Sequence, residues 1–416
     1  MILTVTFLDV YHGDCVVVTF NEGDRKACIV IDGGEKQDAA KRLAAYLKHE
    51  KVEVIDLLVA THIDQDHVNG LVHFLKSESG RTDSWNQGKK KCIHHYWGPK
   101  PDPNWTPPQK KKTAQILPVA LLELQTMNFV IQSVGQNQKL SKLVRERIFN
   151  ADNIRYPSLQ DMPPLELFEN VGLEIMAPDT QILDSAIQSK ALTISNLTYR
   201  QALAMDPAPT RKRLKLEDLH RILAANAEEM AKIADRNANN QSIVFKLTPK
   251  EGKTAKSKEW SFLFTGDAEQ ESWEMMRQIT EVRRNLPCKV LKVPHHGSSL
   301  NGIDETSFKA INPEYSIISV GQKHGLPDGQ TLNLIKRDRK RKLFCTEQNN
   351  SKSHPGPCTK KKCVREKASD FRSIRFTIDT DSGEEKIDTF IINAKLGGIE
   401  IKTGKIWCPE NSWSNR

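Results

Sequence analysis

The chain has 416 residues, enough to bury a large core, and this length favours two or three domains or one elaborated fold. Lys and Arg number 61 against 52 Asp and Glu, and the net charge of +9 permits an anionic partner without requiring one. The sequence lacks an apolar run long enough to span a bilayer, and its first residues alternate like strands rather than like a signal peptide, so we expect a cytoplasmic protein with no membrane partner. The 8 cysteines are scattered, which favours reduced thiols.

Short apolar segments with helical stretches between them recur in two blocks of the chain. The first block predicts strands over 2–8, 15–20, 27–31 and 54–60, and helices over 37–48 and 68–76. The second block predicts strands over 241–247, 260–265, 289–293, 315–320 and 342–345, and helices over 268–280, 304–311 and 330–336. Two sheet-forming halves predict a sandwich covered by helices.

The sequence between the two blocks differs in composition. Residues 77–112 are polar, proline-rich and basic, and 114–150 and 209–236 have helical patterns, the latter amphipathic. We therefore predict a single domain over 1–416. Its parts are a core of 1–76 and 239–346, insertions over 77–238, and a loop-rich C-terminal extension with late strands over 347–416. The amphipathic stretch 209–236 is a candidate binding element for a protein partner.

The stretch THIDQDH places two imidazoles and two carboxylates directly after an apolar strand. His62 and Asp64 are two residues apart on an extended segment and point the same way, so they can share one ion. Asp66 and His67, where the chain turns into a helix, can face a second ion. Two adjacent cations activate water and hold both oxygens of a phosphoester or acyl substrate. The alternative is a polar turn that caps the helix at 68–76.

Two distant strand ends offer the remaining ligands. The segment FLFTGDAEQ ends a strand with Gly266 and Asp267, a carboxylate suited to bridging two ions. The segment LKVPHHGSS ends another strand with His295, His296 and Gly297. Each of these alone reads as an ordinary turn or loop, but their coincidence at strand ends in both blocks indicates a binuclear metal site.

These motifs resemble those of the metallo-β-lactamase fold hydrolases, and within them the branch typified by the C-terminal domain of the DNA-uptake protein ComEC. The matching segments lie in order along the chain over roughly 2–76 and 239–346. They are VYHGDCVVV, VIDGG, THIDQDHVNGL, NNQSIVFKL, FLFTGDAE and LKVPHHGSS. The resemblance implies an α/β fold, a four-layer αββα sandwich with helical and basic loop insertions.

The resemblance also implies roles for individual residues. It assigns two divalent metal ions to His62, Asp64, Asp66, His67, Asp267 and His295. Asp66, Asp267 and His296 would be the catalytic residues, and the assignment within the pair His295 and His296 stays open. Asp14 and Asp32 would orient the ligand imidazoles.

The chain departs from the family pattern in two places. Classical members carry a histidine where this chain has Asn239 and Asn240, and we place Asn240 among the residues that support the ligands. A later Gly-His-Pro is altered, with His324 displaced. The first site is therefore rich in oxygen ligands, which favours Mn²⁺ or Mg²⁺ over Zn²⁺ there, whereas the second site would accept Mn²⁺ or Zn²⁺. We expect a preference for Mn²⁺ overall.

A second group of ligands lies near the C-terminal end of the core. The segment FCTEQNNSKSHPGPCTKKKC carries three thiols and one imidazole, which match a structural Zn²⁺ site. These residues are Cys345, His354, Cys358 and Cys363. Their irregular spacing keeps surface thiols as the alternative.

Three hypotheses of function follow. The first is a nuclease that cleaves phosphodiesters in nucleic acid, such as single-stranded DNA; it rests on the resemblance, on lysine clusters at 89–91, 110–112 and 336–342, and on nearby tryptophans that could stack bases. The second is a hydrolase of a small phosphodiester or nucleotide, with the insertions as a lid. The third is a regulatory or interaction protein with a degenerate metal site.

Overall fold

The computed structural model describes most of the expected core and parts of the intervening sequence. The described residues are 1–77, 85–86, 88–101, 135–159, 171–178, 238–250, 260–299, 302–321, 326–338, 340–346, 373–393 and 398–400.

The first sheet joins the N-terminal strands to strands from the far end of the chain. Its strand order is β15-β14-β13-β1-β2-β3-β4-β5-β6. Pairing is antiparallel from β15 to β3 and parallel from β3 to β6. The strands are β1 (Ile2–Phe7), β2 (Val16–Glu22), β3 (Arg25–Ile31), β4 (Ile55–Val59), β5 (Ile93–Trp97), β6 (Ile154–Arg155), β13 (Ser373–Asp379), β14 (Glu385–Asn393) and β15 (Gly398–Glu400).

The second sheet has the order β12-β11-β10-β9-β8-β7. Its β12, β11, β10 and β9 are parallel, whereas β8 and β7 run antiparallel to their neighbours. The strands are β7 (Val171–Ala177), β8 (Val244–Pro249), β9 (Phe262–Phe264), β10 (Val290–Lys292), β11 (Tyr315–Ile318) and β12 (Lys342–Cys345).

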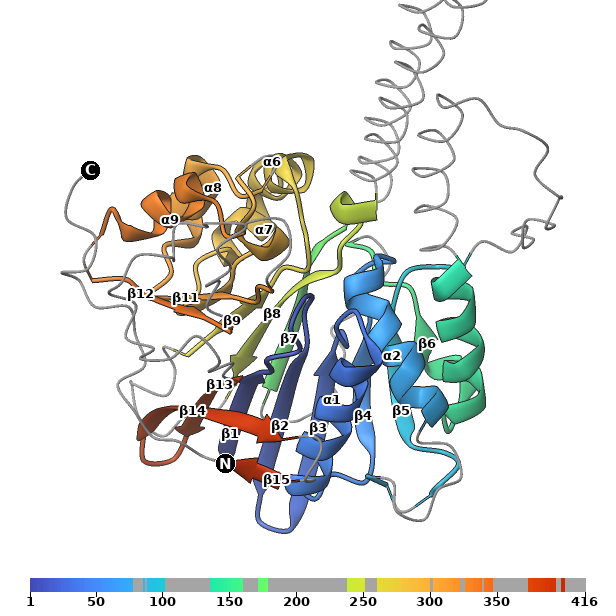
Figure 1. Ribbon diagram of the computed structural model, residues 1–416. Helices are drawn as coiled ribbons and strands as arrows, with labels where there is room; N and C mark the ends of the chain where they lie inside the picture. The colour runs from blue at the N-terminus through green and yellow to red at the C-terminus, as the bar shows by residue number, and fades with distance from the viewer. Residues whose placement is uncertain are drawn as a thin grey trace, which may run out of the picture.

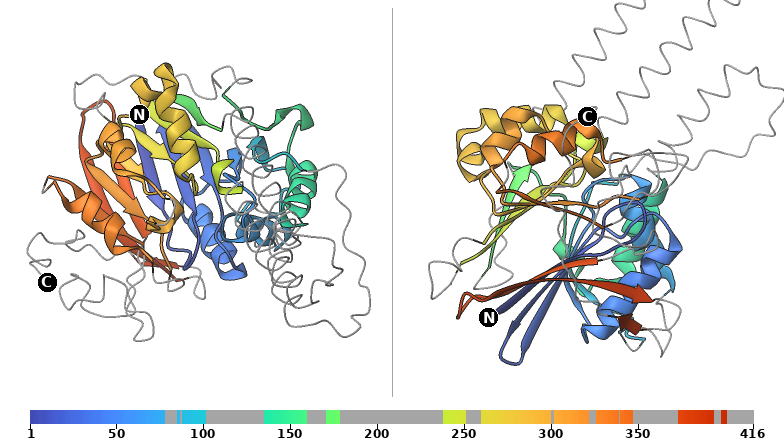
Figure 2. Two further views of the ribbon diagram at one scale, coloured as in Figure 1. Left: turned by 90° about the horizontal axis from the view of Figure 1, so that it is seen from above. Right: turned by 60° about the vertical axis from the view of Figure 1, so that its left-hand side comes forward.

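Helices cover the outer face of each sheet, so the two sheets lie face to face inside a four-layer sandwich (Figures 1 and 2). The helices on the first sheet are α1 (Gln37–His49), α2 (Gln65–Ser77) and the helix over 135–147. Those on the second sheet are α6 (Gln270–Gln278), α7 (Thr280–Asn285), α8 (Glu305–Ile311) and α9 (Gly329–Lys336). Two 3₁₀ turns are η1 (Ala151–Asn153) and η3 (His295–Gly297). The predicted αββα sandwich is confirmed.

The core between the sheets follows from strand periodicity. Val16 and Val18 of β2 join the cluster between the sheets, whereas Val17 joins the cluster under the helices, because alternate side chains of a strand point to opposite faces. Aromatic rings fill the space between the sheets; Phe7, for example, lies 6.3 Å from Phe264 between ring centroids. Burial of such rings supplies much of the stability of a sandwich.

Close backbone contacts bring the first turn of α2 against the end of β3. The Gly33 amide donates to the His67 carbonyl at 2.8 Å, and the Gly70 amide donates to Gly34 at 2.7 Å. A Cβ on Gly70 would lie 1.8 Å from the Gly33 carbonyl oxygen, so only glycine permits this approach. The contact fixes His67 beside the residue that follows β3.

Parts of the stretches expected to be insertions and an extension belong to the sandwich. From 77–238 the sheets take β5, β6 and β7, and the helix over 135–147 packs on the first sheet. Residues 347–416 contribute β13, which pairs with every residue of β1, and β14, which pairs with the other side of β13. The long polar sequence around these strands conceals them, because periodicity only reports local pattern and cannot show pairing across hundreds of residues.

Several sequence predictions lie outside the described residues. The amphipathic stretch 209–236 is one, and His354, Cys358 and Cys363 of the predicted zinc group are others. Cys345 ends β12 and is partly buried. Cys15, Cys28, Cys92 and Cys288 are buried reduced thiols. None of the described helices is long and apolar enough to cross a membrane.

Candidate metal centre

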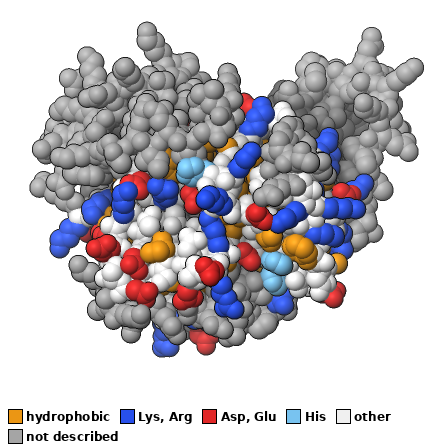
Figure 3. Space-filling model, turned by 90° about the horizontal axis from the view of Figure 1, so that it is seen from below, with side chains coloured by type: hydrophobic (Ala, Val, Ile, Leu, Met, Phe, Trp, Pro, Cys, Tyr) orange, Lys and Arg blue, Asp and Glu red, His pale blue; other side chains and the backbone are white. Residues whose placement is uncertain are grey.

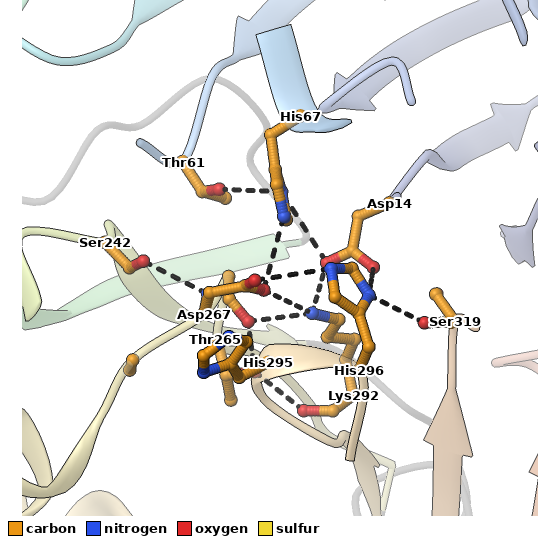
Figure 4. A network of polar contacts seen from close by, with 12 residues as sticks. Asp14, Thr61, His67, Ser242, Thr265, Asp267, Lys292, His295, His296 and Ser319 are labelled. Carbon is orange, nitrogen blue, oxygen red and sulfur yellow. Dashed lines mark hydrogen bonds and ion pairs between the residues drawn. The ribbon is translucent and has the colours of Figure 1, made fainter. Parts of the chain in front are cut away.

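Four ligand atoms from distant parts of the chain converge where the two sheets meet. Asp66, His67, Asp267 and His296, here called the four-ligand cluster, place one ligand atom each within 4.8 Å of the others. His296 Nε2 lies 2.9 Å from Asp66 Oδ2 and 3.3 Å from Asp267 Oδ2. His67 Nε2 lies 3.3 Å from Asp267 Oδ1 (Figure 4). All but Asp66 are buried.

Neighbouring groups fix the orientation of both imidazoles. His296 Nδ1 lies 2.8 Å from the Ser319 carbonyl oxygen, which can only accept, so in the neutral ring Nδ1 donates and Nε2 keeps its lone pair. His67 Nδ1 donates in the same way to Asp32 Oδ2 at 2.8 Å. Both Nε2 atoms therefore face the cluster, held by the kind of hydrogen bond that orients histidine ligands in metal sites.

A second pair of ligands, His62 and Asp64, here called the loop pair, follows β4. The Thr61 hydroxyl donates to Asp32 Oδ2 at 2.7 Å, so it accepts from His62 Nδ1, which is 3.0 Å away. His62 Nε2 keeps its lone pair and lies 3.7 Å from Asp64 Oδ2. Among the described residues, the loop pair does not belong to any group of three or more ligand atoms that lie within 4.8 Å of one another.

The donor set fits a divalent metal ion. His62 Nε2 and His67 Nε2 are buried and have no hydrogen-bond partner among the described residues. Leaving such an atom unsatisfied costs about 1–3 kcal/mol, a cost that a bound metal would remove. Two imidazole nitrogens and two carboxylates are ligands that Mn²⁺ and Zn²⁺ both accept.

Electrostatics in the four-ligand cluster couple metal binding to protons. Burial by itself would raise the pKa of Asp66, but His67 and His296 lower it well below its usual range. Burial would lower the pKa of His296, but Asp267 and Asp66 raise that pKa to about 10. The metal-free cluster is thus held by imidazolium–carboxylate pairs, and a metal that binds must displace protons.

Backbone strain marks the same place. Asp32, His295 and His296 all have positive φ angles, of 56°, 49° and 51°. Non-glycine residues adopt this left-handed conformation rarely, and such residues concentrate at functional sites. In this fold they stand just after β3 and β10, at the two strand ends that border the cluster.

The structure separates the two histidines of LKVPHHGSS. His296 enters the four-ligand cluster, whereas His295 Nδ1 lies 3.3 Å from Glu269 Oε1. The position in the cluster that the sequence analysis gave to His295 is therefore taken by His296. Glu269 is 1% exposed and also accepts from Asn239 Nδ2 at 3.0 Å.

The two asparagines before β8 also have different contacts. Asn240 Oδ1 accepts from the backbone amide of Ser272 at 3.1 Å, and its Nδ2 donates to Glu271 at 3.0 Å, so this side chain holds the first turn of α6. Asn239 instead contacts Glu269. Neither amide is part of the ligand groups described above, and His324 lies outside the described residues.

Sequence reasoning missed two residues of the site. Lys292, the last residue of β10, is 2% exposed and contacts Asp14 and Asp267. A charged residue inside the apolar run VLKV was the available signal. His12 Nε2 lies 3.4 Å from Asp66 Oδ2, and the ring is 5.1 Å from that of His296.

Residues 8–80 match the model of the Metallo-beta-lactamase superfamily. The matched segment supplies Asp14, Asp32 and the run 62–67. No curated protein matches the chain. With the αββα sandwich and the four-ligand cluster, this match is consistent with a metallo-β-lactamase fold and supports a metal-dependent hydrolase. Proteins of this class are typically dinuclear, and the loop pair offers ligands for an additional ion.

Proposed function

We propose that the protein is a Mn²⁺-preferring metallohydrolase of the ComEC-like type that cleaves phosphodiester bonds in nucleic acid. The observation that carries this proposal is the four-ligand cluster. Asp66 and His67 come from the segment that matches the superfamily model, and Asp267 and His296 come from loops at the ends of strands in the second sheet. Carboxylates supply half of its ligands, and the loop pair adds another; oxygen-rich sites favour Mn²⁺ over softer ions.

The chain's own residues prepare the site for such a reaction. Asp32 and Ser319 hold the two imidazoles with Nε2 turned to the cluster, so a cation that displaces the Nε2 protons meets rings that are already oriented. A divalent cation bound there would act as a Lewis acid that draws charge from phosphoryl oxygens and makes water more acidic. Burial of His67, Asp267 and His296 keeps bulk water from screening these charges.

His296 is better suited to hold the cation than to donate a proton to the leaving oxygen. Its Nδ1 is engaged by the Ser319 carbonyl and its Nε2 by Asp66 and Asp267. Both ring nitrogens are therefore committed within the cluster. We assign His296 to the metal and not to proton transfer.

The nucleic-acid substrate rests on the resemblance to the ComEC-type branch and on the positive net charge. Trp85 and Trp97 do not add to it, because they are 5% and 1% exposed and pack in the core, and Trp105 lies outside the described residues. Lys89 pairs with Glu53, and Lys91 donates to the Ile148 carbonyl at 2.6 Å. On the face shown in Figure 3, Lys and Arg side chains lie interspersed with Asp and Glu.

The decisive experiment is a digestion screen of the metal-stripped full chain with Mn²⁺ or Zn²⁺ added back. The substrates are single-stranded DNA, duplex DNA, RNA, a cyclic dinucleotide and bis-p-nitrophenyl phosphate. Asp66→Asn is the test variant, and Asp38→Asn is its matched control, since Asp38 is an exposed carboxylate of α1. We expect Mn²⁺-dependent cleavage of nucleic acid that Asp66→Asn abolishes and Asp38→Asn retains.

The other outcomes are equally informative. Turnover of only the small phosphodiesters would replace the nuclease with a nucleotide-directed hydrolase. Absence of any bound metal would favour an interaction protein with a degenerate site. Strong activity with Zn²⁺ and none with Mn²⁺ would overturn the metal preference.

A further inference from the structure

The Lys292 ammonium is buried among carboxylates on the inner side of the candidate metal centre. It contacts Asp14 Oδ2, lies 3.4 Å from Asp267 Oδ1, and donates to the Gly266 carbonyl at 2.7 Å (Figure 4). The Lys292 side chain is 2% exposed. A charge this deep persists only where opposite charges and hydrogen-bond acceptors surround it.

The carboxylates around this ammonium form a cation pocket of their own. Asp14, Asp32 and His67 place ligand atoms within 4.8 Å of one another, a spacing that suits a metal ion. In the folded chain, however, His67 uses Nδ1 to donate to Asp32 and turns its lone pair the other way. The pocket therefore offers carboxylate oxygens alone, and Lys292 sits on one of them.

The contacts of Lys292 match those of an ammonium. The Nζ atom meets a carboxylate oxygen of Asp14, a carboxylate oxygen of Asp267 and the Gly266 carbonyl, which are three acceptors for its three N–H donors.

We propose that Lys292 is an internal cation that occupies, in place of a metal ion, the pocket formed by Asp14, Asp267 Oδ1 and the Gly266 carbonyl. The ammonium closes this inner side to divalent ions and fixes Asp267, whose other oxygen faces His296. Metal ions are therefore admitted on the outer side of Asp267 alone. Lys292 is a positioning residue and does not itself touch substrate.

Removal of the ammonium should convert the pocket into a metal site. In Lys292→Met, a side chain of similar length leaves Asp14 without its ammonium partner, and this uncompensated buried carboxylate, beside Asp267 Oδ1, attracts a divalent ion. We expect Lys292→Met to bind one more Mn²⁺ per chain than the wild type, measured by equilibrium dialysis with elemental analysis. Lys292→Arg keeps the charge and should bind the wild-type number.

Two further variants isolate the pocket. Lys289→Met removes the same charge from a lysine that packs over Trp260 at 4.1 Å, outside the pocket, and should leave the number of bound ions unchanged. Lys292→Met combined with Asp14→Asn removes the extra carboxylate and should return the count to that of the wild type. If Lys292→Met binds only as many ions as the wild type, or if Lys292→Arg gains an ion as well, the proposal is wrong.

Thermal unfolding covers the case in which the metal-free variant is unstable. Lys292→Met should melt below the wild type in chelator and recover in Mn²⁺ by more than the wild type does, because the ion replaces the lost ammonium. A variant that stays unfolded even when refolded in Mn²⁺ contradicts the proposal. Counting ions requires no substrate, so these results are independent of whether the protein is a nuclease.

Discussion

The four-ligand cluster and the loop pair are neighbours, but they are built differently. The cluster draws its ligands from α2, the turn after β9 and η3, so its geometry is fixed by the packing of two sheets. The loop pair comes from one short segment after β4. Ligands held by packed elements lose little freedom on binding, whereas ligands on one loop do not gather a complete set. The difference teaches us to expect tight binding in the cluster and weak binding at the loop pair.

The largest expected effect is from removal of a cluster carboxylate. Asp66→Ala should lower kcat for phosphodiester cleavage by about 10³-fold, equivalent to about 4 kcal/mol of transition-state stabilisation, because the tight cation loses a ligand. Circular dichroism should show an unchanged fold. Near-normal turnover with the normal metal content would contradict the expectation that the four-ligand cluster binds the essential cation.

The two adjacent histidines provide a sharper test of the same cluster. His296→Ala should weaken Mn²⁺ binding by about 100-fold, comparable to the largest losses seen when ligand support is removed. His295→Ala should leave Mn²⁺ affinity near that of the wild type, because His295 contacts Glu269 instead. Isothermal titration of both variants measures the difference. A larger loss of Mn²⁺ affinity in His295→Ala than in His296→Ala would show that His295, and not His296, binds the metal.

A smaller effect is expected at the loop pair. His62→Ala should reduce activity by about tenfold, since it removes a ligand of the weaker ion. Higher Mn²⁺ concentration should restore part of the lost rate, because weak binding responds to mass action. A loss as large as that of Asp66→Ala, with no rescue by Mn²⁺, would mean that the two halves bind equally well.

A further expected effect, on stability and not on activity, is that the dependence of stability on pH has opposite signs in chelator and in Mn²⁺. The pKa of His296 is raised from 6.5 to about 10, so in chelator its stabilising contribution is complete below pH 6.5 and lost as the pH rises toward 10. The pKa of Asp66 is lowered from 3.8, so its contribution is present above pH 3.8 and lost on further acidification.

Saturating Mn²⁺ should reverse the upper part of this profile. The cation requires neutral imidazoles, so its contribution to stability grows as the pH rises through the same interval. Melting temperatures between about pH 6 and about pH 9 should therefore fall in chelator and rise in Mn²⁺. Parallel slopes in the two conditions would indicate that no ion competes with protons at His296.

Much of the fold could be predicted from local pattern. The strands near 2–8, 15–20 and 27–31 and the helix near 37–48 follow from periodicity, and the structure has them within a few residues. Late strands were expected over 347–416, but the place of β13 and β14 in the first sheet was not predicted, and β5 to β7 were not predicted as strands. Their pairing depends on contacts between residues far apart in sequence, which no local window contains.

The candidate site divides in the same way. The spacing of the run 62–67 predicted which side chains share a face. It could not decide between His295 and His296, because that depends on two consecutive positive φ angles. Nor could it find Lys292, whose charge is meaningful only once Asp14 and Asp267 are seen beside it. Local spacing thus predicts ligands within one segment, and tertiary packing selects among segments.

The central claim is that one cation binds among Asp66, His67, Asp267 and His296. Anomalous X-ray scattering from a crystal grown with Mn²⁺ tests it directly. We predict a strong peak within coordination distance of all four side chains and a weaker one, or none, at the loop pair. A strong peak at His62 and Asp64 with none in the four-ligand cluster would contradict the account.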